Sequence, residues 1–290
     1  MLSIAKILLP VDFSSRSIGA ARYAEALAEK FGASVTMLHV IPPPHYEFAS
    51  MEAGSTALAE LYMNRKEAVE KECNNFLVNE LPQLRARRVL LEGDPAREIV
   101  TFAHDEKCDL IVLPTHGYGP FRRFVLGSVT AKVLHDADCP MMTGVHLEEA
   151  PPVEKIEFKT VLAAVDLGSH SDKVLRWAAD FADKYGARLV VTHAVPSLEG
   201  RTGEYFDPDW RVHPSRQARE SVSSLMSSVG VHGDPFIEAG DPPHVVYDGA
   251  YRFGADLVVI GRGSASGVFG RLRANAYSII RQSPCPVVSV

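Results

Sequence analysis

A glycine-bounded loop is the segment of this chain best suited to chemistry. It runs from Gly117 to Gly127-Ser128, with nine residues between the two glycines. Glycine lets a backbone approach a phosphate closely, and a helix N-terminus offers unpaired N–H groups and a favourable dipole. A helix beginning at Ser128 would add the hydroxyls of Ser128 and Thr130 as donors. The spacing therefore indicates a phosphate-binding loop.

Other catalytic patterns are missing from the sequence. It contains no Gly-Lys-Ser/Thr of a Walker A loop, and no G-x-G-x-x-G follows its first apolar segment. No Ser-His-Asp order and no cage of His, Asp and Glu stands out, so we assign no catalytic residue and no metal ligand. His116, inside the loop, is a candidate to contact phosphate or a bound metal ion.

The elements that must position this loop occur twice. Residues 7–15 return as residues 161–169, and Cys139-Pro140 returns as Cys285-Pro286. A period of about 150 residues is the size of a domain rather than of a solenoid repeat. We therefore expect two domains, residues 1–148 and 156–290, joined by a proline-containing linker at residues 151–155.

Each repeat alternates apolar strands with amphipathic helices, which predicts an α/β fold with a parallel sheet and right-handed crossovers. Ligands of such sheets bind beyond the carboxyl ends of the strands, where Asp12, Val40 and Leu113 are expected. In the first repeat we expect strands at 4–11, 34–40, 87–91, 109–113 and 141–145. The helices are expected from Ser14 or Ser15 to Phe31, at 56–80, from Pro95, and at 128–136.

The second repeat keeps the elements but not the loop. Its expected strands are 160–166, 188–194, near 235–239, 255–260 and 286–290, with helices at 170–185, near 214–228, 242–253 and near 275–283. Ser264 falls where Gly117 sits, and either Ala274-Asn275 or Arg273-Ala274 replaces Gly127-Ser128. Ala164 replaces Pro10 and Ala194 replaces Val40. We expect this loop to obstruct a triphosphate and the repeat to complete the fold as a pseudo-domain.

Composition limits the partners and the compartment. The formal net charge is −6, which argues against a broad surface for nucleic acid or acidic membrane. The four cysteines form no CxxC pair, as in proteins of reducing compartments. Lys6 interrupts the short apolar N-terminal run, and no segment reaches the length of a membrane span. These features predict a soluble, cytoplasmic protein.

The loop and its neighbours resemble the universal stress protein family. The nucleotide loop of that family reads G-x-x-G, nine residues, then G-S or G-T; here Pro114 stands at the first glycine. The segment Pro10-Val11-Asp12-Phe13-Ser14 and the closing Cys139-Pro140 also match. The resemblance covers nearly all of both repeats and identifies a tandem member. It implies two Rossmann-like (adenine nucleotide alpha hydrolase-like) domains, each an open five-stranded parallel sheet flanked by helices.

The resemblance implies ATP in the first domain, with Mg²⁺ or Mn²⁺ held mainly by the phosphates. Asp12 would face the adenosine, the Val40 backbone would bind the adenine edge, and Pro10 and Leu113 would line the base pocket. Arg123 would either approach the phosphates or form a surface ion pair. The phosphates are expected on Gly117, Gly127, Ser128, Val129 and Thr130.

Three functions fit this site. The first is a nucleotide-dependent stress-response or regulatory module, without a committed reaction. The second is a slow metal-dependent ATP hydrolase, although no general base is placed beside the loop. The third is a structural interaction module that binds no nucleotide, which the altered second loop and Pro114 support, since proline lacks an N–H and fixes a dihedral angle.

The last strand of each repeat predicts a partner. Residues 141–145 and 286–290 are short and apolar, and each would leave an unpaired sheet edge. Antiparallel association of equivalent edges covers both, and domains of the family that this chain resembles commonly dimerise in that manner. We expect the two halves to form an internal pseudo-dimer, with no disulfide between Cys139 and Cys285. A further homodimer stays open.

Overall fold

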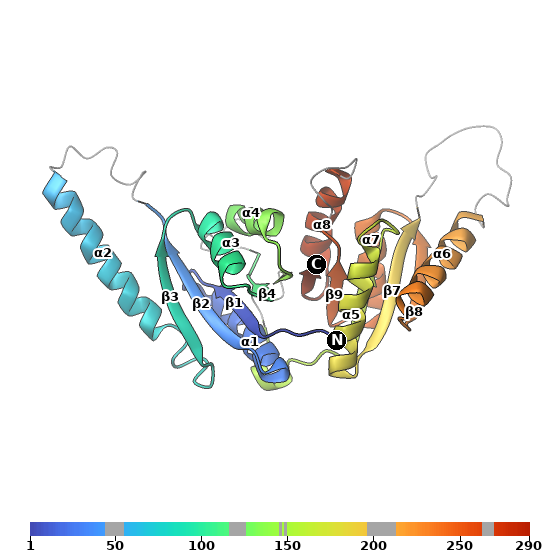
Figure 1. The fold of residues 1–290 in the computed structure, drawn as a ribbon, viewed down its shortest axis with the longest axis horizontal. Coiled ribbons are helices and arrows are strands. Elements are labelled where there is room, and N and C mark those ends of the chain that lie inside the picture. The colour runs from blue at the N-terminus through green and yellow to red at the C-terminus, as the bar shows by residue number, and fades with distance from the viewer. Residues whose placement is uncertain (44–54, 116–125, 145–146, 148–149, 196–212, 263–269) are drawn as a thin grey trace. The chain divides into compact units, whose positions relative to one another are not determined.

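The computed structural model of the protein describes residues 1–43, 55–115, 126–144, 147, 150–195, 213–262 and 270–290 (Figure 1). The chain divides into two compact units. The N-terminal unit contains Ser3–Met141 and Leu147–Ile156, and the C-terminal unit contains Glu157–Val290 with Met1–Leu2 and Met142–His146.

Strands and helices alternate in both repeats. The first repeat contains β1 (Lys6–Pro10), α1 (Ser15–Phe31), β2 (Ser34–Ile41), α2 (Ser55–Asn75), β3 (Ala86–Glu92), α3 (Pro95–Asp105), β4 (Leu110–Val112), α4 (Ser128–Asp136) and β5 (Met141–Thr143). The second contains β6 (Thr160–Ala164), α5 (Ser171–Tyr185), β7 (Arg188–Val195), α6 (His213–Val229), β8 (Asp234–Ala239), α7 (Pro242–Phe253), β9 (Leu257–Ile260), α8 (Gly270–Gln282) and β10 (Val287–Ser289). A short 3₁₀ helix, η2 (Val153–Lys155), lies between them.

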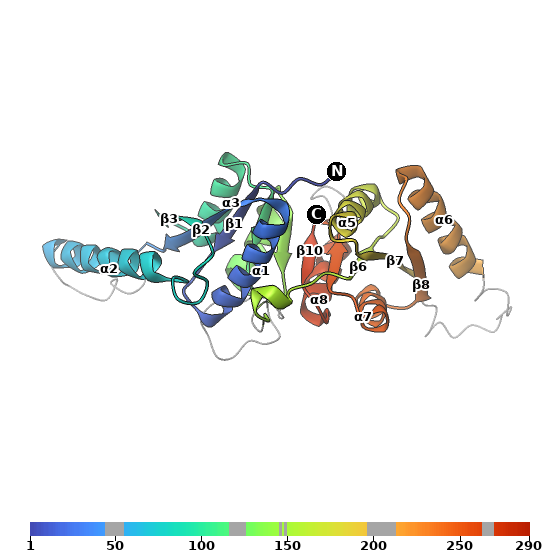
Figure 2. The same cartoon turned by 90° about the horizontal axis from the view of Figure 1, so that it is seen from below.

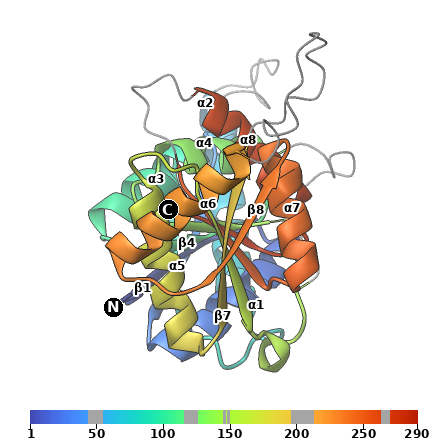
Figure 3. The ribbon, with the colours of Figure 1, turned by 90° about the vertical axis from the view of Figure 1, so that its right-hand side faces the viewer.

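The strand order is the same in the two repeats. It is β3-β2-β1-β4-β5 in the first and β8-β7-β6-β9-β10 in the second, and β1, β2, β3 and β4 pair in parallel, as do β6, β7, β8, β9 and β10. Helix α1 lies on one face of its sheet and α3 on the other (Figure 2). In the C-terminal unit, α5 and α6 cover one face, and α7 and α8 cover the other (Figure 3). The predicted α/β fold is confirmed.

The order of strands reverses between β1 and β4, and again between β6 and β9. At such a switch point the connections leave in opposite directions, which opens a crevice at the carboxyl ends of the strands. The candidate site that the sequence predicts in the first repeat lies at the first of these points.

A continuous apolar run in β1 reflects burial on both faces of the sheet. Ile7, Leu8 and Leu9 are almost completely inaccessible to solvent, as expected for a central strand of a parallel sheet covered by helices on each side. The same requirement explains why strand residues in β4 and β9 are apolar without alternation.

A carboxylate fastens the start of each central strand. Asp109 Oδ2, before β4, accepts hydrogen bonds from the N–H groups of Ala5 and Lys6 at 2.8 and 2.9 Å. In the second repeat Asp256 Oδ2 accepts from Lys159 and Thr160 at 2.7 and 2.9 Å. The two repeats therefore set the relative position of their central strands with the same device.

Several predicted boundaries differ from the structure. The helix expected over 56–80 ends at Asn75, and Leu77 follows with a φ of 67° that a helix cannot contain. The helix expected near 275–283 begins earlier, at Gly270. The final strands are only three residues long in each repeat, Met141–Thr143 and Val287–Ser289.

Two further observations concern the cysteines and the helices. All four cysteines are free. Within the described part of the chain, no helix combines the length and the apolar character that crossing a membrane requires.

Candidate nucleotide site and a second pocket

The base-side residues predicted from sequence lie on neighbouring strands. Pro10 ends β1, Val40 is the penultimate residue of β2, and Leu113 directly follows β4. Because β1 lies between β2 and β4, these three positions meet at one edge of the sheet. Val40 and Leu113 are 6% and 7% exposed, so they contribute mainly to the wall of this region.

Asp12 is held firmly just beyond β1. Its Oδ1 accepts hydrogen bonds from the Ser14 N–H at 3.1 Å, the Ser14 hydroxyl at 2.5 Å and the Ser17 hydroxyl at 2.7 Å. The next residue, Phe13, has a φ of 63°, an uncommon conformation for a bulky residue. Such strain persists only where the surroundings enforce it, and it often marks a functional turn.

The C-terminal unit repeats this turn. Asp166 Oδ1 accepts from the Gly168 N–H and the Ser171 hydroxyl, both at 2.9 Å. Leu167 has a φ of 60°, matching Phe13. Both repeats therefore present an aspartate in the same orientation at the end of their first strand.

The Val40 backbone is available to a ligand on the β1 side of β2. Ile41 bonds to Gly93 on the β3 side through its carbonyl, while the Leu38 carbonyl accepts from Val11 on the β1 side at 2.9 Å. Backbone groups alternate between the two sides of a strand, so the Val40 N–H and C=O face the β1 side. There they lie past the bond between Val11 and Leu38, where β1 has already ended. The predicted contact to a base edge would use these two groups.

Helix α4 presents its N-terminus at the end of β4. Gly127 is its N-cap and makes no side-chain capping bond. The bond from the Ala131 N–H to the Gly127 carbonyl, 2.8 Å long, closes the first turn. The N–H groups of Ser128, Val129 and Thr130 precede that bond and have no acceptor inside the helix. Together with the helix dipole, they form a group of donors suited to an anion.

Two hydrogen bonds tie the start of α4 to the segment after β4. The Gly127 N–H donates to the Thr115 carbonyl at 2.8 Å, and the Thr130 hydroxyl donates to the Pro114 carbonyl at 2.9 Å. Thr130 is 4% exposed. Its hydroxyl therefore orients the helix, and its contribution to a phosphate site would come from the backbone N–H. The predicted residues His116, Gly117 and Arg123 lie outside the described residues.

The histidine at the end of β2 is held by the backbone, as the sequence suggested for a packed histidine. His39 Nδ1 donates to the Val11 carbonyl at 2.8 Å, and the ring stacks on Phe13 with 4.2 Å between centroids. Burial lowers the pKa of His39. His193 makes the same bond to the Val165 carbonyl, also at 2.8 Å.

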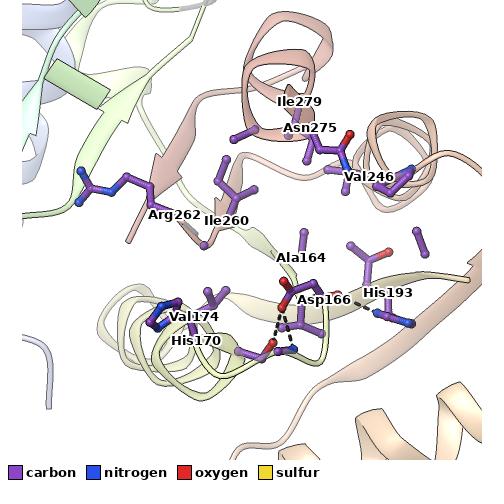
Figure 4. A pocket seen from close by; sticks show the side chains of 18 of the residues that line it. Ala164, Asp166, His170, Val174, His193, Val246, Ile260, Arg262, Asn275 and Ile279 are labelled. Carbon is purple, nitrogen blue, oxygen red and sulfur yellow. Dashed lines mark hydrogen bonds between the residues drawn. The ribbon is translucent and has the colours of Figure 1, made fainter. Parts of the chain in front are cut away.

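The sequence did not reveal a well-formed pocket in the C-terminal unit. A cavity of about 390 Å³ lies at the switch point between β6 and β9, within the size range of small-molecule sites. Figure 4 shows Ala164, Asp166, His193, Ile260 and Asn275 around one hollow. A signal was present in the sequence. Three residues at this edge, Ala164, Thr192 and Ala194, are smaller than their counterparts Pro10, Leu38 and Val40.

Helix α8 does not reproduce the N-terminus of α4. When the repeats are aligned on Cys139 and Cys285, Ala274 corresponds to Ser128, yet α8 begins four residues before it, at Gly270. An N–H four residues into a helix bonds to the carbonyl of the first turn. The amides that point outward in α4 are consequently used within α8, which gives a physical reason for the predicted loss of the phosphate grip.

Metal ligation by the protein is not apparent where the structure is described. In those residues, no group of three or more His, Cys, Asp or Glu side chains is placed to hold a metal ion.

Known proteins resemble both halves of the chain. The model of the universal stress protein family matches residues 3–143 and 157–290. A universal stress protein of Methanocaldococcus jannaschii is 33% identical over 137 residues, covering 47% of this chain and 79% of the relative. One of Mycolicibacterium smegmatis is 25% identical over 296 residues, covering 98% of this chain and 96% of the relative. The crystal structure of a universal stress protein from Archaeoglobus fulgidus has the same fold, with a TM-score of 0.69, 22% identity and coverage of 99% of this chain and 98% of that one.

Proposed function

This chain belongs to the universal stress protein family, and on that premise we propose that its N-terminal unit binds ATP as a nucleotide-dependent stress-response or regulatory module. The observation that carries the proposal is the N-terminus of α4, which has no side-chain cap and opens beside the carboxyl ends of β1 and β4. The donors there suit a phosphate chain, and the strand ends suit a base.

The adenosine would lie across the ends of β1 and β2. Pro10, Val40 and Leu113 supply an apolar wall, and the Val40 N–H and C=O offer one donor and one acceptor to the adenine edge. Asp12, held by Ser14 and Ser17, would accept a hydrogen bond from a ribose hydroxyl. This arrangement recognises a base and a sugar without any charged contact to the base.

The phosphates would lie on the N–H groups of Ser128, Val129 and Thr130, with Gly127 allowing close approach. Gly117, His116 and Arg123 complete the proposed grip from the loop. Mg²⁺ or Mn²⁺ would be held mainly by the phosphates. When bound, the metal ion would neutralise phosphate charge.

We extend the proposal to compartment and assembly. Four free cysteines fit the reducing conditions of a cytoplasm. The apolar final strands β5 and β10 are proposed to cover each other as an internal pseudo-dimer, since an unpaired apolar edge promotes association.

The first test is whether nucleotide accompanies the purified protein. Mass spectrometry of denatured protein should detect ATP, and calorimetry on nucleotide-free protein with Mg-ATP should give about one site per chain. Saturation at 100 times the dissociation constant should add about 2.7 kcal/mol to the free energy of unfolding of the binding unit. Protein that carries no nucleotide and takes none up would leave the structural interaction module as the better description.

A further inference from the structure

Two of the four cysteines lie at neighbouring corners of the N-terminal unit. Cys108 is in the connection from α3 to β4, and Cys139 is in the connection from α4 to β5. Strands β4 and β5 are neighbours in the sheet, and the Ile111 N–H donates to the Pro140 carbonyl at 2.9 Å to join them. The fold therefore brings together two thiols that are distant in the sequence.

The register of the two strands sets the distance between these cysteines. In the C-terminal unit, the residue whose N–H bonds to the Pro286 carbonyl is paired with the residue after that proline. The same register sets Met141 opposite Ile111 and brings Cys139 to within one position of Cys108. Neighbouring strands are about 4.8 Å apart and rise about 3.3 Å per residue, so this diagonal separates the Cα atoms by about 6 Å. Disulfides join Cα atoms about 4.4–6.8 Å apart.

The surroundings of the two thiols differ. Cys108 is 8% exposed, whereas Cys139 is partly exposed. Burial raises the pKa of the Cys108 thiol to about 11, and Cys139 adds more to this rise than the carboxylates of Glu106 and Asp109 do. Because the interaction of charges weakens with distance, the two sulfurs lie close to each other. An oxidant from solvent reaches Cys139 first, with Cys108 placed behind it.

The second repeat provides an internal reference for this corner. Ala255 stands where the first repeat has Cys108, and Cys285 stands where it has Cys139. Ala255 is 9% exposed and Cys285 is 6% exposed, so the same packing forms with a single thiol. Burial raises the pKa of the Cys285 thiol to about 12. The fold thus accepts alanine at the Cys108 position, and only the first repeat has two thiols there.

We propose that Cys108 and Cys139 form a reversible disulfide when a peroxide oxidises the protein, as a redox modification site of the N-terminal unit. The Cys139 sulfur attacks the peroxide, and an S–O bond forms as the O–O bond breaks and the first water leaves. The Cys108 sulfur then attacks the Cys139 sulfenic acid, which forms the S–S bond and releases the second water. Two thiols lose two electrons and two protons, and hydrogen peroxide becomes two waters. A thiol reductant reverses the modification by disulfide exchange.

The disulfide would close a loop over residues 108–139. This loop contains β4, the predicted phosphate loop and α4. A cross-link restricts the unfolded chain, so the oxidised protein should be more stable than the reduced protein. Disulfides of cytosolic proteins are usually transient and redox-sensing, which suits the compartment proposed above. The link requires no nucleotide, so it can be tested whether or not ATP binds.

The test uses the full chain, fully reduced and then treated with hydrogen peroxide under native conditions. The number of titratable thiols should fall from four to two. Mass spectrometry of an unreduced digest should show the Cys108 peptide linked to the Cys139 peptide, and dithiothreitol should restore both thiols. The melting temperature of the oxidised protein should be higher by several degrees.

Cys108→Ala removes the second thiol and introduces the residue that the second repeat has. This variant should form no link, and its Cys139 sulfenic acid should accumulate and be captured by dimedone more than in the parent. Peroxide should leave its melting temperature without the rise seen in the parent. Cys73→Ala removes another buried thiol and is the matched control, so it should form the link as the parent does.

Four outcomes would overturn the proposal. They are four titratable thiols in peroxide-treated native protein, a link that involves Cys73 or Cys285, equal dimedone capture at Cys139 in the parent and in Cys108→Ala, and a Cys108–Cys139 link that forms only in urea. The last outcome would show that the folded protein holds the two sulfurs apart.

Discussion

At the scale of single residues, the two repeats differ by small changes with large chemical effects. Both keep an aspartate fixed at the end of the first strand and a histidine bonded to the preceding strand. They differ at Gly127, which precedes the first-turn amides of α4, and at Thr192, which stands where the first repeat has Leu38. The shared residues maintain the edge of the sheet, and the differing residues change the surface that this edge presents.

Gly127→Val should greatly weaken ATP binding while the fold is kept. Gly127 has φ and ψ of −58° and 146°, which valine adopts without strain, so its effect comes from the branched side chain beside the helix N-terminus. Valine is a poor N-cap, which should cost about 1 kcal/mol of stability. Ala274→Val in α8 is the matched control and should leave ATP affinity unchanged. Equal affinities in calorimetry for both variants and the parent would exclude α4 as the phosphate site.

The His39 ring should titrate below its ordinary pKa of 6.5 because burial disfavours its charged form. The unfolded chain then binds a proton that the folded chain does not, so stability falls as the pH drops from 6.5 toward the lower folded pKa. His39→Asn keeps an N–H donor for Val11 and should flatten this slope. Burial raises the pKa of Glu25, so above pH 4.5 Glu25 makes the stability change with pH in the opposite direction. The titration of the His39 ring is therefore followed directly by NMR. A ring titrating at or above 6.5 would contradict the prediction.

At the scale of elements, the carboxylates before β4 and β9 hold each central strand at its start. Asp109 and Asp256 each accept two backbone N–H bonds, and this repetition indicates that the fold depends on the contact. The bonds fix the offset between neighbouring strands, which in turn sets the position of the carboxyl ends of those strands.

Asp256→Ala should lower the free energy of unfolding by about 1–3 kcal/mol, because it leaves two N–H groups without their charged acceptor. Asp109→Ala should act in the same direction in the N-terminal unit. Urea denaturation measures both. The Asp→Asn variant at either position keeps an acceptor oxygen and should lose less stability than the alanine variant. If the alanine variants are as stable as the parent, water replaces the carboxylate fully as the acceptor of these N–H groups.

At the scale of the whole molecule, the proposed pseudo-dimer can be tested at the backbone amides of the two final strands, β5 and β10. The Pro140 carbonyl accepts a hydrogen bond from the Ile111 N–H in β4, and the Pro286 carbonyl accepts one from the Val258 N–H in β9. By alternation, the N–H groups of Met141 and Thr143 face away from β4, and those of Val287 and Ser289 face away from β9.

If β5 and β10 cover each other, hydrogen exchange at these four amides should be slow. Exchange should then match that of amides within the sheet, such as Ile111 and Val258, because all would open together. An uncovered edge would instead exchange the four amides quickly while Ile111 and Val258 stay protected. That second pattern would contradict the pseudo-dimer without any mutation of the strands.

The sequence alone determined the fold class and the strand ends at which the first candidate site was predicted. Duplicated strand and cap patterns specify an α/β fold because buried parallel strands must be apolar and helices must begin at caps, and both requirements are local. The same locality placed Pro10, Asp12, Val40 and Leu113 at strand ends. Only the tertiary structure decided where α8 begins, which depends on packing across many residues rather than on a cap. It also decided that three smaller residues, Ala164, Thr192 and Ala194, leave a pocket instead of being filled by their neighbours. A cavity is a property of side chains from β6, β7, β9, α5, α7 and α8 together, so no single segment of the sequence contains it.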